Sequence, residues 1–124
     1  MNKLKLSKLS KTWIFDLDGT LLEHNGHLTN EDKFLPGVLS FLQSISEDDK
    51  IVILTARSSE YSAETLKKFD EAGINVDHWV FDLGSGERIL FNDDKPSGLR
   101  MAFCYSVKRN QGLEDFEIAE SGDL

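Results

Sequence analysis

The chain has 124 residues, a mass of 14.0 kDa and 40% hydrophobic residues, which together describe a single globular domain. Its 14 basic and 22 acidic residues leave a net charge of −8, which argues against a nucleic-acid partner because such binding relies on excess lysine and arginine. A single cysteine, Cys104, predicts a reducing, cytoplasmic compartment. We expect no membrane partner, because residues 1–11 do not resemble a signal peptide and no apolar run approaches the about 20 residues that span a bilayer.

Short apolar runs and helical repeats alternate along the first part of the chain. Residues 13–17 form an apolar run that ends in acidic residues and glycine, as expected of a buried strand that leads into a loop. Apolar residues at spacings of three and four predict a helix over 36–45, and residues 51–54 predict a second buried strand. A second helix is predicted to begin after Ser58 and to end at Gly73.

Three more strands are predicted at residues 78–81, 89–91 and 102–107. The alternation of strands and helices predicts an α/β fold, a single Rossmann-like three-layer domain with a mainly parallel sheet of about five strands covered on both faces. Residues 82–88 are too few for a crossover helix, so they form either a hairpin or a short passage across the strand ends.

The end of the chain differs from the rest in its charge. Residues 114–124 hold five acids and no basic residue, which predicts a solvated tail or a fraying helix. We therefore expect one domain over residues 1–124, with a core at about 12–108 and an acidic tail at about 114–124.

Polar side chains follow three of the predicted strands, where ligands bind in open α/β sheets. Asp16 and Asp18 follow the first strand, Thr55 the second, and Asp93 the fourth. Carboxylates held a few ångströms apart repel each other unless a proton or a cation lies between them. Oxygen ligands without histidine or thiolate indicate Mg²⁺, and a hydroxyl and a lysine, here Lys95, suit a phosphate dianion beside it.

Each of these segments also has a plainer structural interpretation. Residues 16–19 are typical of a turn, because Asp and Gly are favoured there. Asp93 can belong to a helix cap or a solvated loop, and Thr55 can be a helix cap. Their joint occurrence at the ends of three predicted strands favours a functional site.

The sequence resembles the haloacid dehalogenase-like (HAD) hydrolases, most of which are Mg²⁺-dependent phosphatases. The resemblance is carried by FDLDGTL at residues 15–21, ILTAR at 53–57 and LFNDD at 90–94. It spans residue 13 to about residue 107, and residues 86–96 are similar to a small capless subgroup of the family. A HAD-like fold without a cap domain is therefore expected.

The resemblance implies a mechanism for these residues. Asp16 would attack phosphorus to form an aspartyl-phosphate, while Asp18 would protonate the leaving oxygen and then take a proton from water. Mg²⁺ would be held by Asp16, by the backbone carbonyl of Asp18 and by Asp93. Thr55 and Lys95 would complete the catalytic set. The phosphate-binding set is Gly19, Thr55, Ala56 and Lys95.

One position departs from the family pattern. The family places a lysine ahead of the last acidic pair, whereas this sequence has none between Lys68 and Asp93. Lys95, just after the acidic pair, is the favoured replacement. Arg88, or no such cation at all, are the alternatives.

The expected function is Mg²⁺-dependent hydrolysis of a phosphomonoester, with a phosphorylated sugar or another small metabolite as substrate. Residues 20–36 and 57–92 leave no room for a folded lid, so we expect an open site, with a homo-oligomer covering it as one means of closure. The alternative function is a HAD-like domain that binds phosphate or a phosphorylated ligand with weak or no turnover. A response-regulator receiver domain ranks third, because the acidic pair comes late in the chain.

Overall fold

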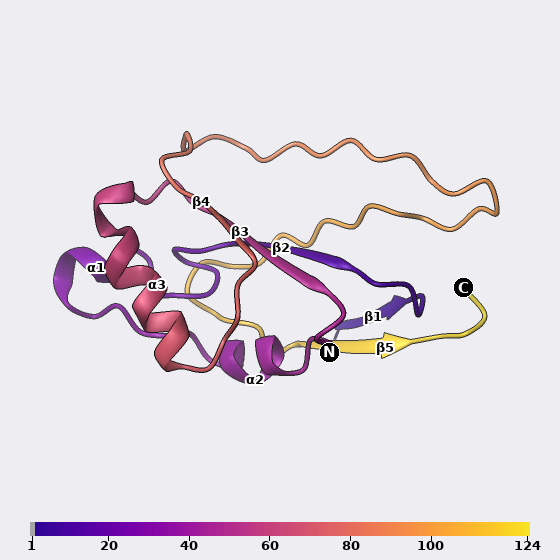
Figure 1. Ribbon diagram of the computed structural model, residues 1–124, viewed down its shortest axis with the longest axis horizontal. Coiled ribbons are helices and arrows are strands. Elements are labelled where there is room, and N and C mark those ends of the chain that lie inside the picture. The colour runs from indigo at the N-terminus through magenta and orange to yellow at the C-terminus, as the bar shows by residue number, and fades with distance from the viewer. Residues whose placement is uncertain (1) are drawn as a thin grey trace.

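The structure is a computed structural model that describes residues 2–124, and it contains two separate parallel sheets (Figure 1). The larger sheet has the order β2-β3-β4, built from β2 (Thr12–Asp16), β3 (Lys50–Leu54) and β4 (His78–Val80). In the smaller sheet, β1 (Asn2–Leu6) pairs with β5 (Phe116–Glu120). The expected α/β class with parallel strands is confirmed, although the strands form two sheets rather than one.

Within the described residues 2–124, four short helical segments connect the strands: α1 (Gly26–Thr29), α2 (Val38–Gln43), the 3-10 helix η1 (Ser59–Tyr61) and α3 (Ser62–Glu71). The predicted start and stop of the second helix are confirmed. The Ser58 side chain accepts a hydrogen bond from the backbone N–H of Glu60, and Gly73 adopts the left-handed φ of 75° that ends α3. The N–H of Ile74 donates to the carbonyl of Phe69, which completes a Schellman motif.

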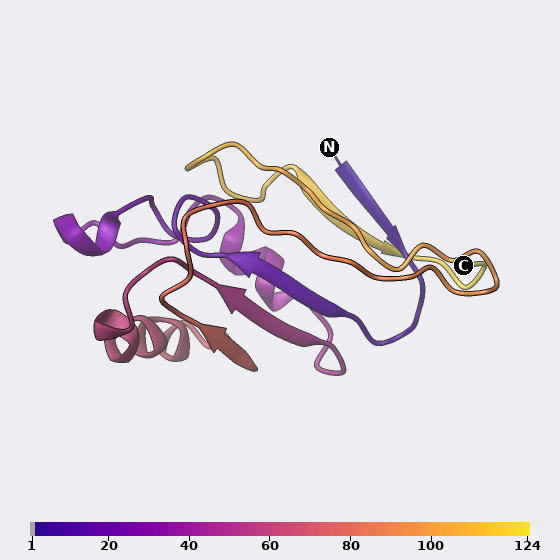
Figure 2. The same cartoon turned by 90° about the horizontal axis from the view of Figure 1, so that it is seen from above.

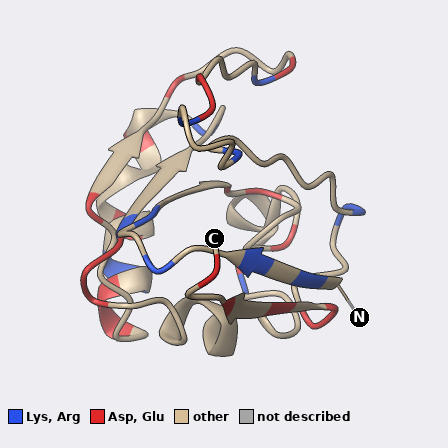
Figure 3. Cartoon of the chain, turned by 90° about the vertical axis from the view of Figure 1, so that its right-hand side faces the viewer, with Lys and Arg blue, Asp and Glu red and all other residues tan. Residues whose placement is uncertain are grey.

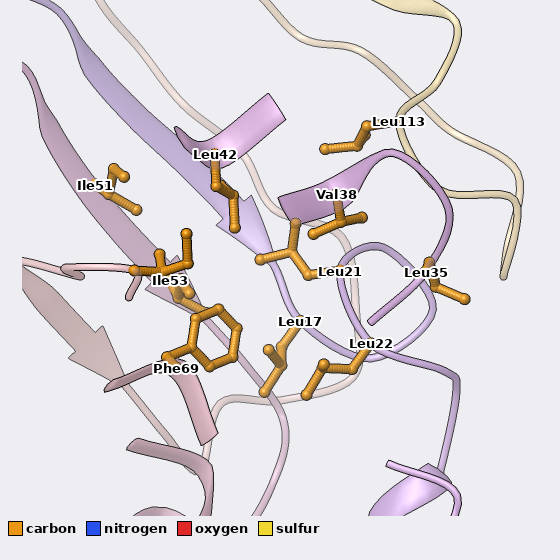
Figure 4. Packing of buried hydrophobic residues seen from close by; sticks show 11 residues of the cluster. Leu17, Leu21, Leu22, Leu35, Val38, Leu42, Ile51, Ile53, Phe69 and Leu113 are labelled. Atoms are coloured by element: carbon orange, nitrogen blue, oxygen red, sulfur yellow. The ribbon is translucent and has the colours of Figure 1, made fainter. Parts of the chain in front are cut away.

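α2 and α3 cover one face of the larger sheet. Ile51 and Ile53 alternate inward along β3 and pack against α2 and the Phe69 ring of α3 (Figure 4). On the opposite face Ile14 and Val80 are exposed. The sheet is therefore covered by helices on one face, which differs from the two covered faces that the sequence predicted.

Two of the predicted strands are wrong. Residues 89–91 and 102–107 form no strand in the structure of residues 2–124; instead residues 89–106 leave the sheet as an extended excursion that returns toward it (Figures 1 and 2). The Phe91 side chain is 90% exposed. An apolar run predicts a strand only where another strand pairs with it, and none pairs with these residues.

The predicted acidic tail is also corrected, because residues within it form β5. Leu4 of β1 is buried and lies opposite Ile118, while Lys3 lies opposite Glu117. Opposite charges on facing strands favour this pairing, and Figure 3 shows the basic residues of β1 beside the acidic β5. The acidic charge of residues 114–124 predicted a tail or a fraying helix, whereas part of this segment forms a strand.

Residues 82–88 form the passage across the strand ends that was one of the two expectations. The N–H of Asp82 donates to the carbonyl of Arg57, and the N–H of Leu83 donates to that of Thr55, so the chain crosses the end of β3. No cap domain is inserted anywhere in residues 2–124, as expected. Among these residues, no helix has both the length and the apolar character needed to cross a membrane.

Candidate active site

The strands of the larger sheet are parallel, so their carboxyl ends meet at one edge, and the turn after β2 lies there. The carbonyl of Leu17 accepts hydrogen bonds from the N–H groups of Thr20, Leu21 and Leu22, which closes residues 17–22 into a tight turn. Gly19 has a φ of 87°, a backbone conformation that favours glycine. This turn brings Asp16 and Asp18 to the same edge.

A pocket of about 270 Å³ opens beside this turn. Its lining residues are Asp16, Asp18, Gly19, Thr20, Val107 and Arg109. The Asp16 side chain is 42% exposed, and its Oδ2 accepts a hydrogen bond from the Thr20 hydroxyl at 3.0 Å. Nη2 of Arg88 lies 3.8 Å from Asp16 Oδ1. An accessible carboxylate thus faces a polar pocket with two guanidinium groups nearby.

Arg109 reaches the pocket because the chain after the excursion binds to the turn that follows β2. The N–H of Asn110 donates to the carbonyl of Gly19 at 2.8 Å, and the Asn110 side chain accepts from the N–H of His24 at 2.8 Å. A side chain at Gly19 would place its Cβ 3.2 Å from Cγ of Arg109. These contacts fix a basic residue beside Asp16 and Asp18 from a distant part of the sequence.

Asp18 is held by a buried arginine. Arg57, whose side chain is 1% exposed, donates from Nη2 to Asp18 Oδ1 at 2.6 Å and from Nε to Oδ2 at 3.3 Å. Its Nη1 and Nη2 donate to the two oxygens of Asp32 at 3.0 and 2.9 Å, and Nη1 also donates to the Thr65 hydroxyl at 3.0 Å. Burial disfavours the charge, but the hydrogen bonds to Asp32 and Asp18 outweigh it and raise the pKa of Arg57.

A fifth polar side chain, His27, lies against this cluster. Burial lowers the pKa of His27, and the Arg57 guanidinium lowers it further, against the opposing effect of the nearby carboxylates. Ligand atoms of Asp18, His27 and Asp32 lie within 4.8 Å of one another, close enough to hold a metal ion. The guanidinium of Arg57 lies between the Asp18 and Asp32 carboxylates and supplies the positive charge of this cluster.

The structure brings together some of the predicted site residues and separates others. Asp16, Asp18 and Gly19 line one pocket. Thr55 is buried at the end of β3, where its Oγ1 accepts from the N–H of Arg57 at 2.9 Å, and it does not line the pocket. The adjacent Ala56 is exposed at the same edge.

Asp93 and Lys95 lie on the 89–106 excursion and do not line the pocket. Lys95 makes backbone hydrogen bonds with Leu99 and Gly98 in a turn within the excursion. Figures 1 and 2 show the far end of the excursion toward the amino ends of the strands, away from the edge that carries Asp16. The cations near Asp16 are Arg88 and Arg109 rather than the favoured Lys95.

The α/β domain, with Asp16 at the end of β2 and Asp18 two residues later, agrees with the resemblance to the HAD-like hydrolases. A family model described as NLI interacting factor-like phosphatase matches residues 11–83, which is more than half of the 124 residues. The chain belongs to this family of phosphatases. Comparison with curated proteins and with solved structures found no match.

Proposed function

We propose that the chain is a Mg²⁺-dependent phosphomonoester hydrolase that acts through an aspartyl-phosphate. The observation that carries this proposal is the accessible Asp16 carboxylate in a pocket shared with Asp18 and Arg109. Arg88, 3.8 Å from Asp16, and Arg109 are proposed to bind the phosphate in the role first assigned to Lys95. Guanidinium groups suit this role because they can donate two parallel hydrogen bonds to phosphate oxygens.

In the proposed first step, a carboxylate oxygen of Asp16 forms a bond to phosphorus while the bond from phosphorus to the ester oxygen breaks. The leaving oxygen keeps that electron pair and takes the proton of Asp18, so an alcohol is released. Asp18, now a carboxylate, takes a proton from water as the water oxygen attacks the phosphorus. In this second step the bond between phosphorus and the Asp16 oxygen breaks, the Asp16 carboxylate keeps the electron pair, and inorganic phosphate is released.

The residues at the pocket fit Mg²⁺ in their donor chemistry, because carboxylate and carbonyl oxygens are the ligands that a hard cation prefers. Asp16 and the backbone carbonyl of Asp18 are proposed to hold the ion. Asp93, the third predicted ligand, lies on the excursion and is not part of the pocket. When bound, Mg²⁺ would offset the repulsion between the Asp16 carboxylate and a phosphate dianion.

A phosphorylated sugar or another small metabolite is the proposed substrate, acted on in the cytoplasm. The pocket volume of about 270 Å³ supports a small phosphorylated group at the site. The net charge of −8 opposes long polyanions such as nucleic acids. Because residues 2–124 contain no cap domain, we also propose that a second copy of the chain covers the open site.

The test is hydrolysis of p-nitrophenyl phosphate with Mg²⁺ and with a chelator. We expect turnover that the chelator removes and that Asp16→Asn lowers by about 10⁴-fold or more, as expected for loss of a nucleophile. Asp70→Asn, on the exposed face of α3, is the matched control and should keep full activity. Thermal stabilisation by phosphate without turnover would instead support a binding domain, and the proposed hydrolase would be wrong.

A further inference from the structure

Arg57 connects three separate parts of the chain at the active site. Its five N–H groups make five hydrogen bonds, two to Asp18, two to Asp32 and one to Thr65 of α3. No N–H of the guanidinium is left for another partner. The orientation of the group therefore depends on both carboxylates at once.

Asp32 brings a surface loop into this network. Residues 23–33 close on themselves through a hydrogen bond from the N–H of Glu23 to the carbonyl of Lys33, and the N–H of Glu31 donates to the carbonyl of Gly26. Asp32 links this 23–33 loop to Arg57 through two hydrogen bonds at 2.9 and 3.0 Å. Because both carboxylate oxygens take part, the link fixes an angle as well as a distance.

Loss of the Asp32 carboxylate would change the position of Asp18. Two buried N–H groups of Arg57 would then lack their acceptor, which costs free energy in a side chain that is 1% exposed. Rotation of the guanidinium toward new acceptors would move the two donors that hold Asp18. An acid displaced by about 1 Å transfers its proton less efficiently, because such catalysis depends on close geometry.

We propose that Asp32 is a positioning residue that acts through Arg57 to hold the Asp18 carboxyl group toward the leaving oxygen of the substrate. This inference rests on the proposed function, since it assigns a purpose to the arrangement around the general acid. It gives Asp32 an indirect role at the active site, although Asp32 does not line the pocket beside Asp16.

The test compares two esters that differ in their need for a proton. p-Nitrophenolate leaves readily without one, whereas the alkoxide of glycerol 2-phosphate needs one. We expect Asp32→Asn to lower kcat/KM for glycerol 2-phosphate by about tenfold or more, within the roughly 10²–10⁴-fold that general acid catalysis contributes, and to change p-nitrophenyl phosphate less than about threefold. Asp32→Glu, which keeps the charge, should restore part of the loss.

Glu31→Gln is the matched control, because Glu31 is exposed beside Asp32 and its side chain makes no hydrogen bond or ion pair within residues 2–124. Thermal unfolding of each variant shows whether it is folded. If Asp32→Asn is unfolded, Asp32→Glu takes its place in the comparison of the two esters. An equal loss on both esters, or no loss, would overturn the positioning role while leaving the phosphatase intact. Absence of turnover of either ester by the unaltered chain would overturn the proposed function and this inference together.

Discussion

Residues 12–83 and the 89–106 excursion have similar fractions of apolar residues, but many of these residues are buried in the first region and most are exposed in the second. In the first region, Ile53 and Phe69 are buried and the strands pair along their full length. In the excursion, Ile89, Leu90 and Phe91 are exposed and form no strand. The family match covers the first region and ends before the second.

The difference shows that an apolar run predicts burial only where a second surface covers it. The strands of the larger sheet have α2 and α3 on one face, and the burial of their side chains repays the loss of chain entropy on folding. The excursion has few such contacts, among them the Tyr105 ring 5.7 Å from that of Phe116. Stability should therefore be concentrated in residues 12–83.

The largest predicted effect contrasts one phenylalanine from each region. Phe69→Ala should lower the free energy of unfolding by about 3–5 kcal/mol, because the ring is 1% exposed and packs edge-on against Phe34 and Trp79. Phe91→Ala should change it by less than about 0.5 kcal/mol, because the ring is in solvent. Urea unfolding followed by tryptophan fluorescence measures both. Comparable losses of unfolding free energy in the two variants would contradict the difference in stability between the two regions.

A smaller effect is expected at a buried carboxylate in the first region. Asp49 accepts hydrogen bonds from the backbone N–H of Lys11 at 3.0 Å and from Nε1 of Trp13 at 2.9 Å, joining the start of β2 to the turn before β3. Asp49→Ala should cost about 1–3 kcal/mol, because both donors lose their acceptor. The exposed neighbour Asp48 offers the control Asp48→Ala, for which urea unfolding should show no loss. A matching loss at Asp48 would indicate a general charge effect instead.

Much of the first region could be predicted from the sequence, because its signals are local. The apolar run that became β2, the cap at Ser58 and the stop at Gly73 each depend on residues close in sequence, and all three are confirmed. The strands predicted at 89–91 and 102–107 required partners that no local signal specifies. The pairing of β1 with β5 was missed because it joins the two ends of the chain.

The candidate site divides in the same way. Asp16, Asp18 and Gly19 follow one strand, so their proximity is set by a single turn and was predictable. Arg57 stands in the segment that carried the resemblance, yet its role was missed because its two carboxylate partners, Asp18 and Asp32, come from other loops. Asp32 and Arg109 gave no sequence signal for this site. The tertiary fold brings both residues to the site: Arg57 holds Asp32, and the hydrogen bond from Asn110 to Gly19 places Arg109.

The smallest predicted effect lies at Asp82, where the first region ends. The Asp82 carboxylate accepts from the N–H of Ser59 at 2.8 Å, and hydrogen bonds with Ser59 lower the pKa of Asp82 below its usual 3.8. Because the pKa is lower in the folded chain, the stabilisation is complete above pH 3.8 and is lost as the pH falls below it.

Asp82→Asn isolates this contribution, because asparagine also tolerates the left-handed φ of 63° at this position. The variant should unfold at a slightly lower temperature than the unaltered chain at pH 6, and the gap should narrow as the pH falls through 3.8 toward 3. Asp70→Asn on α3 should show no such narrowing, since its exposed carboxylate accepts no hydrogen bond within residues 2–124. If the difference in unfolding temperature between Asp82→Asn and the unaltered chain did not change with pH, the contact with Ser59 would not depend on the charge of the Asp82 carboxylate. The backbone hydrogen bonds alone would then hold the passage across the strand ends.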